Sequence, residues 1–221
     1  MVRNMIKKIT IPKKYKKRFI KTKSFEFPPK RLIYLYGCNG IGKSSLLELI
    51  NNHYNKPKFI DETVETEIDT YLEKPIKCLY WKAETDSAGR GKNSNTLLKN
   101  IDMFVDYYQA TRTSEGEAII NNFINFLERL DISEINLLLI DEVDSGLGIG
   151  SINILKGYIY NFLKKNPHIS IIMGINNYQW IYKENIEVYR MDKGKNVKIN
   201  SYDEFVELTI NINEKLLNKN K

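Results

Sequence analysis

Long apolar runs and cysteines are both scarce in this chain of 221 residues. No apolar run approaches the roughly 18–20 residues that a membrane-spanning helix needs. The two cysteines cannot form a disulfide framework, and their spacing fits no zinc site. The N-terminal residues are charged and lack the apolar segment ending in small residues that marks a secretory signal. These absences predict a soluble protein of the cytoplasm.

The hydrophobic fraction of 42% and the charged fraction of 28% are ordinary for a folded domain, and they exclude a disordered or fibrous chain. We expect residues 1–221 to form a single domain. The sequence has no internal repeat, and no heptad pattern long enough for a coiled-coil arm. A bias toward Lys and Asn suggests an AT-rich genome, such as that of a phage or a low-GC bacterium.

Positive charge is concentrated at the N-terminus. The net charge is +7, but residues 1–31 hold twelve Lys and Arg side chains against one acid, Glu26, and the remainder is mildly acidic. Such a basic arm predicts contact with a polyanion such as DNA or RNA, because bound phosphates release counterions. The residues expected to make this contact are Lys13, Lys14, Lys16, Lys17 and Arg18. The alternative is that these lysines form the solvated face of amphipathic strands.

Strand and helix patterns alternate along the chain. Short apolar or alternating runs predict strands over residues 6–11, 18–27, 31–36, 75–81, 135–140, 169–175, 186–191 and 197–199. Helical periodicity predicts helices over residues 44–54, 95–111, 118–130 and 152–164, and from 202 onward. This order favours an α/β fold with a mostly parallel central sheet and an N-terminal antiparallel β segment. The helices within residues 95–131 would form a small inserted lobe.

The loop between the strand at 31–36 and the following helix fits the phosphate-binding pattern G-x-x-x-x-G-K-[ST]. Its residues are Gly37, Cys38, Asn39, Gly40, Ile41, Gly42, Lys43 and Ser44. The glycines let the backbone curl so that successive N–H groups point at one phosphate. Lys43 would reach the β- and γ-phosphates, and the Ser44 hydroxyl would be a Mg²⁺ ligand.

A second motif, Asp141-Glu142, ends the apolar strand at 135–140. Asp141 suits the hydration shell of Mg²⁺, and Glu142 can orient and deprotonate an attacking water. A small-molecule kinase has its own acceptor hydroxyl and does not need that adjacent base. The guanine-specifying pattern Asn-Lys-x-Asp is absent, which disfavours GTP. A strand that happens to end in two solvated acids is the alternative.

The loop, with Asn39 before Gly40 and the doubled serine Ser44-Ser45, resembles the Walker A loop of ATP-binding-cassette (ABC) ATPases. That group includes the structural-maintenance-of-chromosomes and RecF-type DNA-repair ATPases. Residues 141–147 resemble the family's Walker B motif and D-loop, usually D-E-P-T-S-G-L-D. The resemblance implies that Glu142 is the catalytic base, and that the dimer seam contains Ser145, Gly146 and Leu147.

Residues 113–117, Thr-Ser-Glu-Gly-Glu, are similar to the family's signature segment. In the family that segment contacts the γ-phosphate of the nucleotide bound by the opposite subunit, which implies that role for Ser114, Gly116 and Glu117. A helix N-terminus, where we expect these residues, favours a phosphate. Ser114 and Glu117 also have the spacing of a capping box, and the two interpretations are compatible.

The sequence lacks three features of the family. Gly148 replaces the last aspartate of the D-loop, and the segment Met173-Gly-Ile-Asn-Asn177 has no switch histidine. Asn176 or Asn177 is the candidate there, and Asn176 is the one we assign a catalytic role. A neutral amide can bind a γ-phosphate but cannot shuttle a proton, so slow hydrolysis is expected. No Q-loop glutamine is evident, and Glu84 is the nearest candidate on the metal side.

These motifs and the resemblance together predict an ATPase that uses ATP and Mg²⁺ and works as an ATP-dependent homodimer. We expect it to act in a nucleic-acid-linked process such as repair, replication or mobile-element defence. The first alternative is the nucleotide-binding subunit of an ABC transporter, which would need a membrane partner. The second is a P-loop nucleotide kinase.

Overall fold

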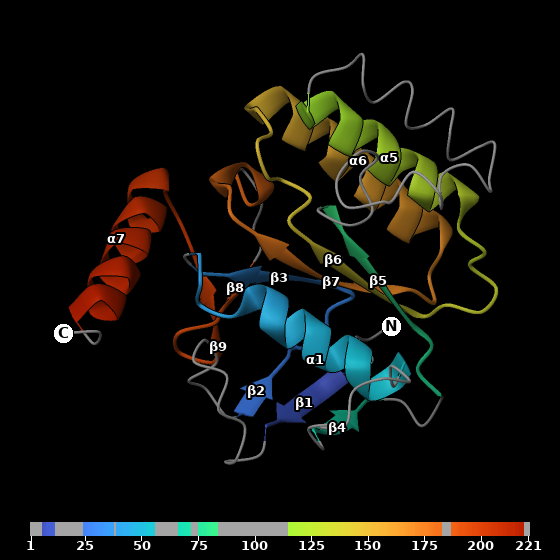
Figure 1. Ribbon diagram of the computed structural model, residues 1–221, viewed down its shortest axis with the longest axis horizontal. Helices are drawn as coiled ribbons and strands as arrows, with labels where there is room; N and C mark the ends of the chain where they lie inside the picture. Colours follow the sequence, from blue (N-terminus) through green and yellow to red (C-terminus); the bar gives the residue numbers. More distant parts are fainter. Residues whose placement is uncertain are drawn as a thin grey trace, which may run out of the picture.

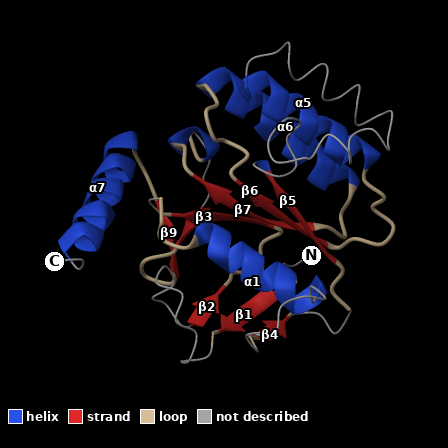
Figure 2. Cartoon of the chain, in the orientation of Figure 1, coloured by secondary structure: helices blue, strands red, loops and turns tan. Residues whose placement is uncertain are grey.

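The computed structural model describes residues 6–11, 24–37, 39–55, 66–71, 75–83, 115–182 and 187–218. In these parts the chain forms two sheets flanked by helices (Figures 1 and 2). The elements in chain order are β1 (Ile6–Thr10), β2 (Ser24–Glu26), β3 (Leu32–Tyr36), α1 (Lys43–Asn55), β4 (Glu67–Thr70), β5 (Cys78–Lys82), α5 (Glu115–Arg129), β6 (Leu137–Asp141), α6 (Ile149–Lys165), β7 (Ser170–Ile175), the 3₁₀ turn η1 (Tyr178–Trp180), β8 (Glu187–Arg190), β9 (Lys195–Lys198) and α7 (Tyr202–Asn218).

The larger sheet has six strands in the order β5-β6-β7-β3-β8-β9. Every neighbouring pair is parallel except β8 and β9, so the expected mostly parallel sheet is confirmed. Strand β7 lies between β3 and β6, with Leu35 opposite Gly174 and Ile140 opposite Met173. Because parallel strands end at the same edge, this order brings together the segments that follow β3, β6 and β7.

The smaller sheet is antiparallel, in the order β2-β1-β4. It confirms the expected N-terminal antiparallel segment. The sequence did not predict β4, because its four residues are mostly polar and only Ile68 packs against the core. Of the strand predicted over residues 18–27, residues 24–26 form β2, and residues 18–23 lie outside the described part of the chain.

Two apolar clusters cover the two faces of the larger sheet. Ile33 and Leu35 of β3 pack with α1 and β1, whereas Tyr34 and Tyr36 pack on the opposite face, where α5 and α6 lie. Figure 1 shows α1 and the small sheet on one side of the large sheet, and α5 and α6 on the other. Burial of both faces explains why these strands read as continuous apolar runs. No helix in the described residues is both long and apolar enough to cross a bilayer.

Several predicted boundaries are wrong by a few residues, and three of them have a clear physical reason. Helix α5 begins at Glu115, whereas the sequence predicted residue 118. The prediction was late because the first turn of the helix is polar and the apolar pattern starts only after it. Helix α6 begins at Ile149 and not at 152, since its first residues are exposed. Strand β5 begins at Cys78 and not at 75, because the Asn136 side chain binds the backbone of Pro75 and Lys77 in place of a strand ladder. The helix predicted over residues 95–111, with most of the expected lobe, lies outside the described residues.

Candidate nucleotide-binding site

The loop between β3 and α1 has the backbone that the phosphate-binding pattern demands. Gly40 and Gly42 have φ values of +79° and +103°, which side-chain-bearing residues rarely adopt. A Cβ atom added to Gly37 would lie 2.7 Å from Cγ2 of Ile41, so the tight curl also needs glycine there. Helix α1 starts at Lys43, directly after the loop. The first N–H groups of a helix point away from its body, and a helix N-terminus suits an anion.

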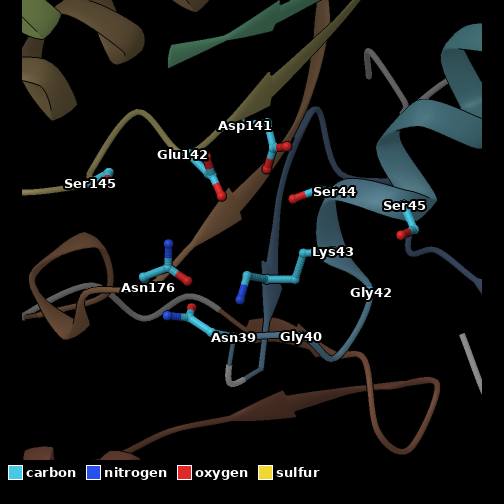
Figure 3. A pocket seen from close by; sticks show the side chains of 10 residues that line it. All are labelled: Asn39, Gly40, Gly42, Lys43, Ser44, Ser45, Asp141, Glu142, Ser145 and Asn176. Carbon is cyan, nitrogen blue, oxygen red and sulfur yellow. The ribbon is translucent and has the colours of Figure 1, made fainter. Parts of the chain in front are cut away.

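A cavity of about 260 Å³ opens where β3, β6 and β7 end. Figure 3 shows the side chains that surround it. Three separate segments of the sequence contribute residues, and all of these residues were candidates from the sequence alone. The lining residues are Asn39, Gly40, Gly42, Lys43, Ser44, Ser45, Asp141, Glu142, Ser145 and Asn176.

Lys43 is only 7% exposed although it carries a positive charge. Its Nζ donates a hydrogen bond of 2.6 Å to the carbonyl oxygen of Gly37, which holds the ammonium group over the loop. Burial of an ammonium group lowers the stability of the fold unless the group contacts a hydrogen-bond acceptor or an anion. The arrangement therefore keeps a cation at the wall of the cavity, where a phosphate group can interact with it.

Asp141 is 1% exposed and is oriented by a neighbouring strand. The Tyr80 hydroxyl on β5 donates to Oδ2 of Asp141 at 2.9 Å. Burial raises the pKa of Tyr80 well above its ordinary value, and the nearby Asp141 charge raises it further, so Tyr80 stays a neutral donor. Sequence analysis did not single out Tyr80, because nothing local shows that it faces a residue 61 positions away.

Ser44 and Asp141 face each other across the cavity in Figure 3. A hydroxyl and a carboxylate are hard oxygen donors, and this pair fits Mg²⁺. The described residues contain no group of three or more His, Cys, Asp or Glu side chains that could hold a metal. A cation at this position would therefore draw its remaining ligands from nucleotide phosphates and water.

Glu142 is held in an unusual backbone conformation. Its φ of +58° makes it the only residue other than glycine with a positive φ in the described part of the chain. This conformation costs roughly 1–2 kcal/mol for an L-residue. It persists because the turn after β6 is tight, with the amide of Ser145 bonded to the Glu142 carbonyl at 3.1 Å. In Figure 3 the Glu142 carboxylate points into the cavity.

The structure distinguishes the two asparagines that follow β7. Asn176 lines the cavity, whereas Oδ1 of Asn177 accepts a hydrogen bond of 2.9 Å from the Gln179 amide and so begins η1. The backbone amides of both residues donate to Oδ2 of Asp144, at 2.7 and 3.0 Å. Asp144 was missed in the sequence, although its replacement of the family's threonine was a visible signal. Burial raises the pKa of Asp144, while donors from Asn176, Asn177 and Trp180 oppose that rise.

The candidates for the dimer seam and for the signature segment differ in where they lie. Ser145 and Gly146 are exposed, whereas Leu147 is 7% exposed and packs in the core. Gly116 and Glu117 lie in the first turn of α5, and Glu117 does not line the cavity. The remaining candidates fall outside the described residues, and these are Cys38, Glu84, Ser114, Lys13, Lys14, Lys16, Lys17 and Arg18.

Comparisons with known proteins support the fold. No family model matches the chain, and no curated protein matches its sequence. The structure of a metal-chelate type ABC transporter in an inward-facing conformation is similar, with a TM-score of 0.54 and 14% identity over 94% of this chain and 89% of that one. The ATP-binding subunit of an ABC transporter has a TM-score of 0.51 and 14% identity, over 92% and 98% of the two chains.

Stu0660 of Streptococcus thermophilus is similar as well, with a TM-score of 0.54 and 12% identity over 89% of this chain and 77% of that one. At such low identity the likeness establishes the fold alone. The chain has the P-loop fold of ABC-type ATPase domains.

Proposed function

We propose that this protein binds ATP with Mg²⁺ and hydrolyses it to ADP and phosphate. The observation that carries the proposal is the convergence of Lys43, Asp141 and Glu142 on one cavity, from elements far apart in the sequence. A phosphate loop alone suits any nucleotide enzyme. A carboxylate directed into the same cavity, beside the metal-side aspartate, adds a base for water.

Each lining side chain has a distinct task in this proposal. Lys43 and the loop amides neutralise and orient the phosphates, and Ser44 and Asp141 hold the Mg²⁺. The bound metal would offset the charge that develops on the phosphate oxygens. Glu142 accepts a proton from the attacking water, and the Asn176 amide hydrogen-bonds the γ-phosphate.

Two substitutions test the assignment. We expect Lys43→Ala to weaken ATP binding about 10- to 100-fold, because a charge-assisted bond to phosphate is lost. Glu142→Gln should retain binding but lower kcat on the order of 10²- to 10⁴-fold, because the general base is lost. Fluorescent-nucleotide titration and phosphate release measure the two effects. Lys164→Ala and Glu128→Gln, on exposed helix surfaces, are the matched controls. Wild-type turnover by Glu142→Gln would contradict the role of Glu142.

We further propose that two chains sandwich ATP and act on nucleic acid through the basic N-terminal arm. The support is the run of lysines in residues 1–31 and the resemblance of residues 113–117 to a segment that serves the opposite subunit. Exposure of Ser145 and Gly146 beside the cavity leaves the D-loop open to such a partner.

Nucleic-acid binding has a charge-matched test. Changing Lys13, Lys14, Lys16, Lys17 and Arg18 to Gln should reduce DNA affinity and flatten its salt dependence, because fewer counterions are released. The control changes five exposed lysines elsewhere, namely Lys164, Lys165, Lys193, Lys195 and Lys198, which alters the net charge equally. Fluorescence anisotropy at several salt concentrations measures both. An equal loss of DNA affinity in the two variants would contradict a specific role of the N-terminal arm in DNA binding.

A transporter subunit is the second candidate, because two of the similar structures are named as an ABC transporter and as a subunit of one. In that case a membrane protein should co-purify with the tagged chain, and DNA should leave the ATPase rate unchanged. Phosphoryl transfer to an added nucleotide, without release of free phosphate, would instead indicate a kinase.

A further inference from the structure

The segment after β7, which carries Asn176, is attached to a buried carboxylate. Asp144 is 4% exposed, and its Oδ2 accepts hydrogen bonds from the amides of Asn176 and Asn177 at 2.7 and 3.0 Å. The indole Nε1 of Trp180, itself fully buried, donates to the same oxygen at 3.0 Å. Three N–H groups on one oxygen compensate the desolvation of the carboxylate and fix its orientation.

The same turn carries the proposed base. Asp144 lies two residues after Glu142, and the Leu147 amide closes the turn onto the Asp144 carbonyl at 3.2 Å. The carboxylate of Asp144 is therefore a short, rigid link between the backbone of Glu142 and the backbone of Asn176. A long contact of 3.4 Å also joins Oδ1 of Asp144 to the Asn176 side-chain nitrogen.

The far end of this segment is held by the opposite charge. Lys156 of α6 is 7% exposed, and its Nζ donates to the carbonyl oxygens of Gln179 and Tyr182 at 3.2 and 3.5 Å. The Gln179 side chain donates to Asn153, also on α6, at 2.8 Å. Asp144 therefore binds backbone N–H groups at the start of the segment, and Lys156 binds backbone carbonyl groups at its end.

We propose that Asp144 is a positioning residue for Asn176. It holds the Asn176 backbone at a set distance from the Glu142 turn, so that the amide and the base keep their relative placement around the γ-phosphate. This inference rests on the proposed ATPase function. It differs from a general stabilising role because it requires the effect of Asp144 on turnover to pass through Asn176.

Asp144→Asn is the informative substitution. The new NH₂ group faces either the three N–H donors or the Asn176 side-chain nitrogen, so at least one donor–donor contact arises in either orientation. We expect kcat to fall roughly 10- to 100-fold with an unchanged KM for ATP, as a misplaced catalytic group would cause. In an Asn176→Ala background the same change should have little further effect, because the two residues act as one unit.

Arg31→Gln is the matched control. Its guanidinium donates to the carbonyl oxygens of Ile169, Leu163 and Asn166 at 3.0, 2.6 and 2.6 Å, at the opposite end of strand β3 from the cavity. We expect this variant to lose thermal stability comparably while keeping its kcat. Trp180→Phe removes one donor but leaves the bonds to the Asn176 and Asn177 amides, and it should also keep its kcat.

Three outcomes would overturn the proposal. These are a wild-type kcat in Asp144→Asn, a loss of the same size in the Asn176→Ala background, and an equal loss of kcat in Arg31→Gln. If Asp144→Asn does not fold, Asp144→Ser is judged by the same comparison.

Failure of the proposed function is distinguishable. If the wild-type protein releases no phosphate from ATP, the ATPase assignment fails. The link is then judged by amide hydrogen exchange. Faster exchange at Asn176 and Asn177 in Asp144→Asn, but not in Arg31→Gln, supports it, and unchanged exchange contradicts it.

Discussion

Glu142 shows how a single residue combines strain and chemistry. Its positive φ would suit glycine, yet Glu142 places a carboxylate at the wall of the cavity, and the surrounding packed turn offsets the cost of the conformation. Val143 and Asp144, the next two residues, are buried and hold that turn in place. A strained residue at such a position is typical of active sites.

The thiol of Cys78 is a residue-scale probe of burial. Cys78 is 8% exposed at the start of β5, and burial raises its pKa from 9.0 to about 12. In a Cys38→Ser background, we expect the rate of alkylation of the folded protein to keep rising with pH between 7 and 10. An accessible thiol would level off near pH 9. Mass spectrometry of quenched samples measures the rate.

The same pKa shift has a consequence for stability. The thiol of the unfolded chain ionises near pH 9, whereas the folded thiol stays protonated up to about pH 12. Because the unfolded state releases its proton first, the free energy of unfolding falls as the pH rises through this range. A plateau of the alkylation rate near pH 9 in the folded protein would contradict both expectations.

At the scale of elements, strand β7 lies between the strand that leads into the glycine loop and the strand that ends at Asp141. It pairs with β3 on one side and with β6 on the other, so it passes between Lys43 and Asp141. A Cβ atom on Gly174 would lie 3.3 Å from Oδ1 of Asp141 and 3.7 Å from Cβ of Lys43. The absence of a side chain there allows these two groups to approach each other.

Gly174→Ala should therefore disturb the site without breaking the sheet. The added methyl must displace Asp141 by a few tenths of an ångström, and we expect a weaker Mg²⁺ dependence of ATP binding and a lower kcat. Gly157→Ala is the control, because a Cβ in the middle of α6 meets nothing within 4 Å. It should raise the free energy of unfolding by about 0.5–1 kcal/mol and leave binding unchanged. Identical nucleotide binding by Gly174→Ala and wild type would contradict this account.

For the whole molecule, the proposed cycle couples nucleotide state to association. Lys43, Glu142 and Asn176 of one chain line the cavity. The resemblance of residues 113–117 to the family's signature segment implies that a second chain completes the nucleotide site. Hydrolysis would remove the γ-phosphate that joins the two chains, so a variant that binds ATP without hydrolysing it should remain associated.

We expect Glu142→Gln to sediment as a dimer with ATP and Mg²⁺, and as a monomer with ADP. Sedimentation velocity measures the difference. Lys43→Ala in the same background should remain a monomer at ATP concentrations that saturate Glu142→Gln but lie below the raised Kd of Lys43→Ala, because little nucleotide is then bound. If Glu142→Gln sediments as a monomer under every condition, the ATP-dependent dimer is contradicted. The ATPase assignment does not depend on this result and is tested by the hydrolysis assay.

The sequence by itself determined the parts of this protein that are local. The phosphate loop was predictable because eight contiguous residues set its backbone, and the strands β3, β6 and β7 were predictable because burial on both faces leaves a continuous apolar run. The alternation of strands and helices then favoured the parallel α/β fold that the structure has.

Only the tertiary structure decided which distant residues meet. The contact of Tyr80 with Asp141 and the link from Asp144 to the segment after β7 both depend on strand order. Insertion of β7 between β3 and β6 joins residues 32 or more positions apart, and no local pattern encodes such a distance. Local chemistry specifies the loop, whereas sheet topology specifies its neighbours.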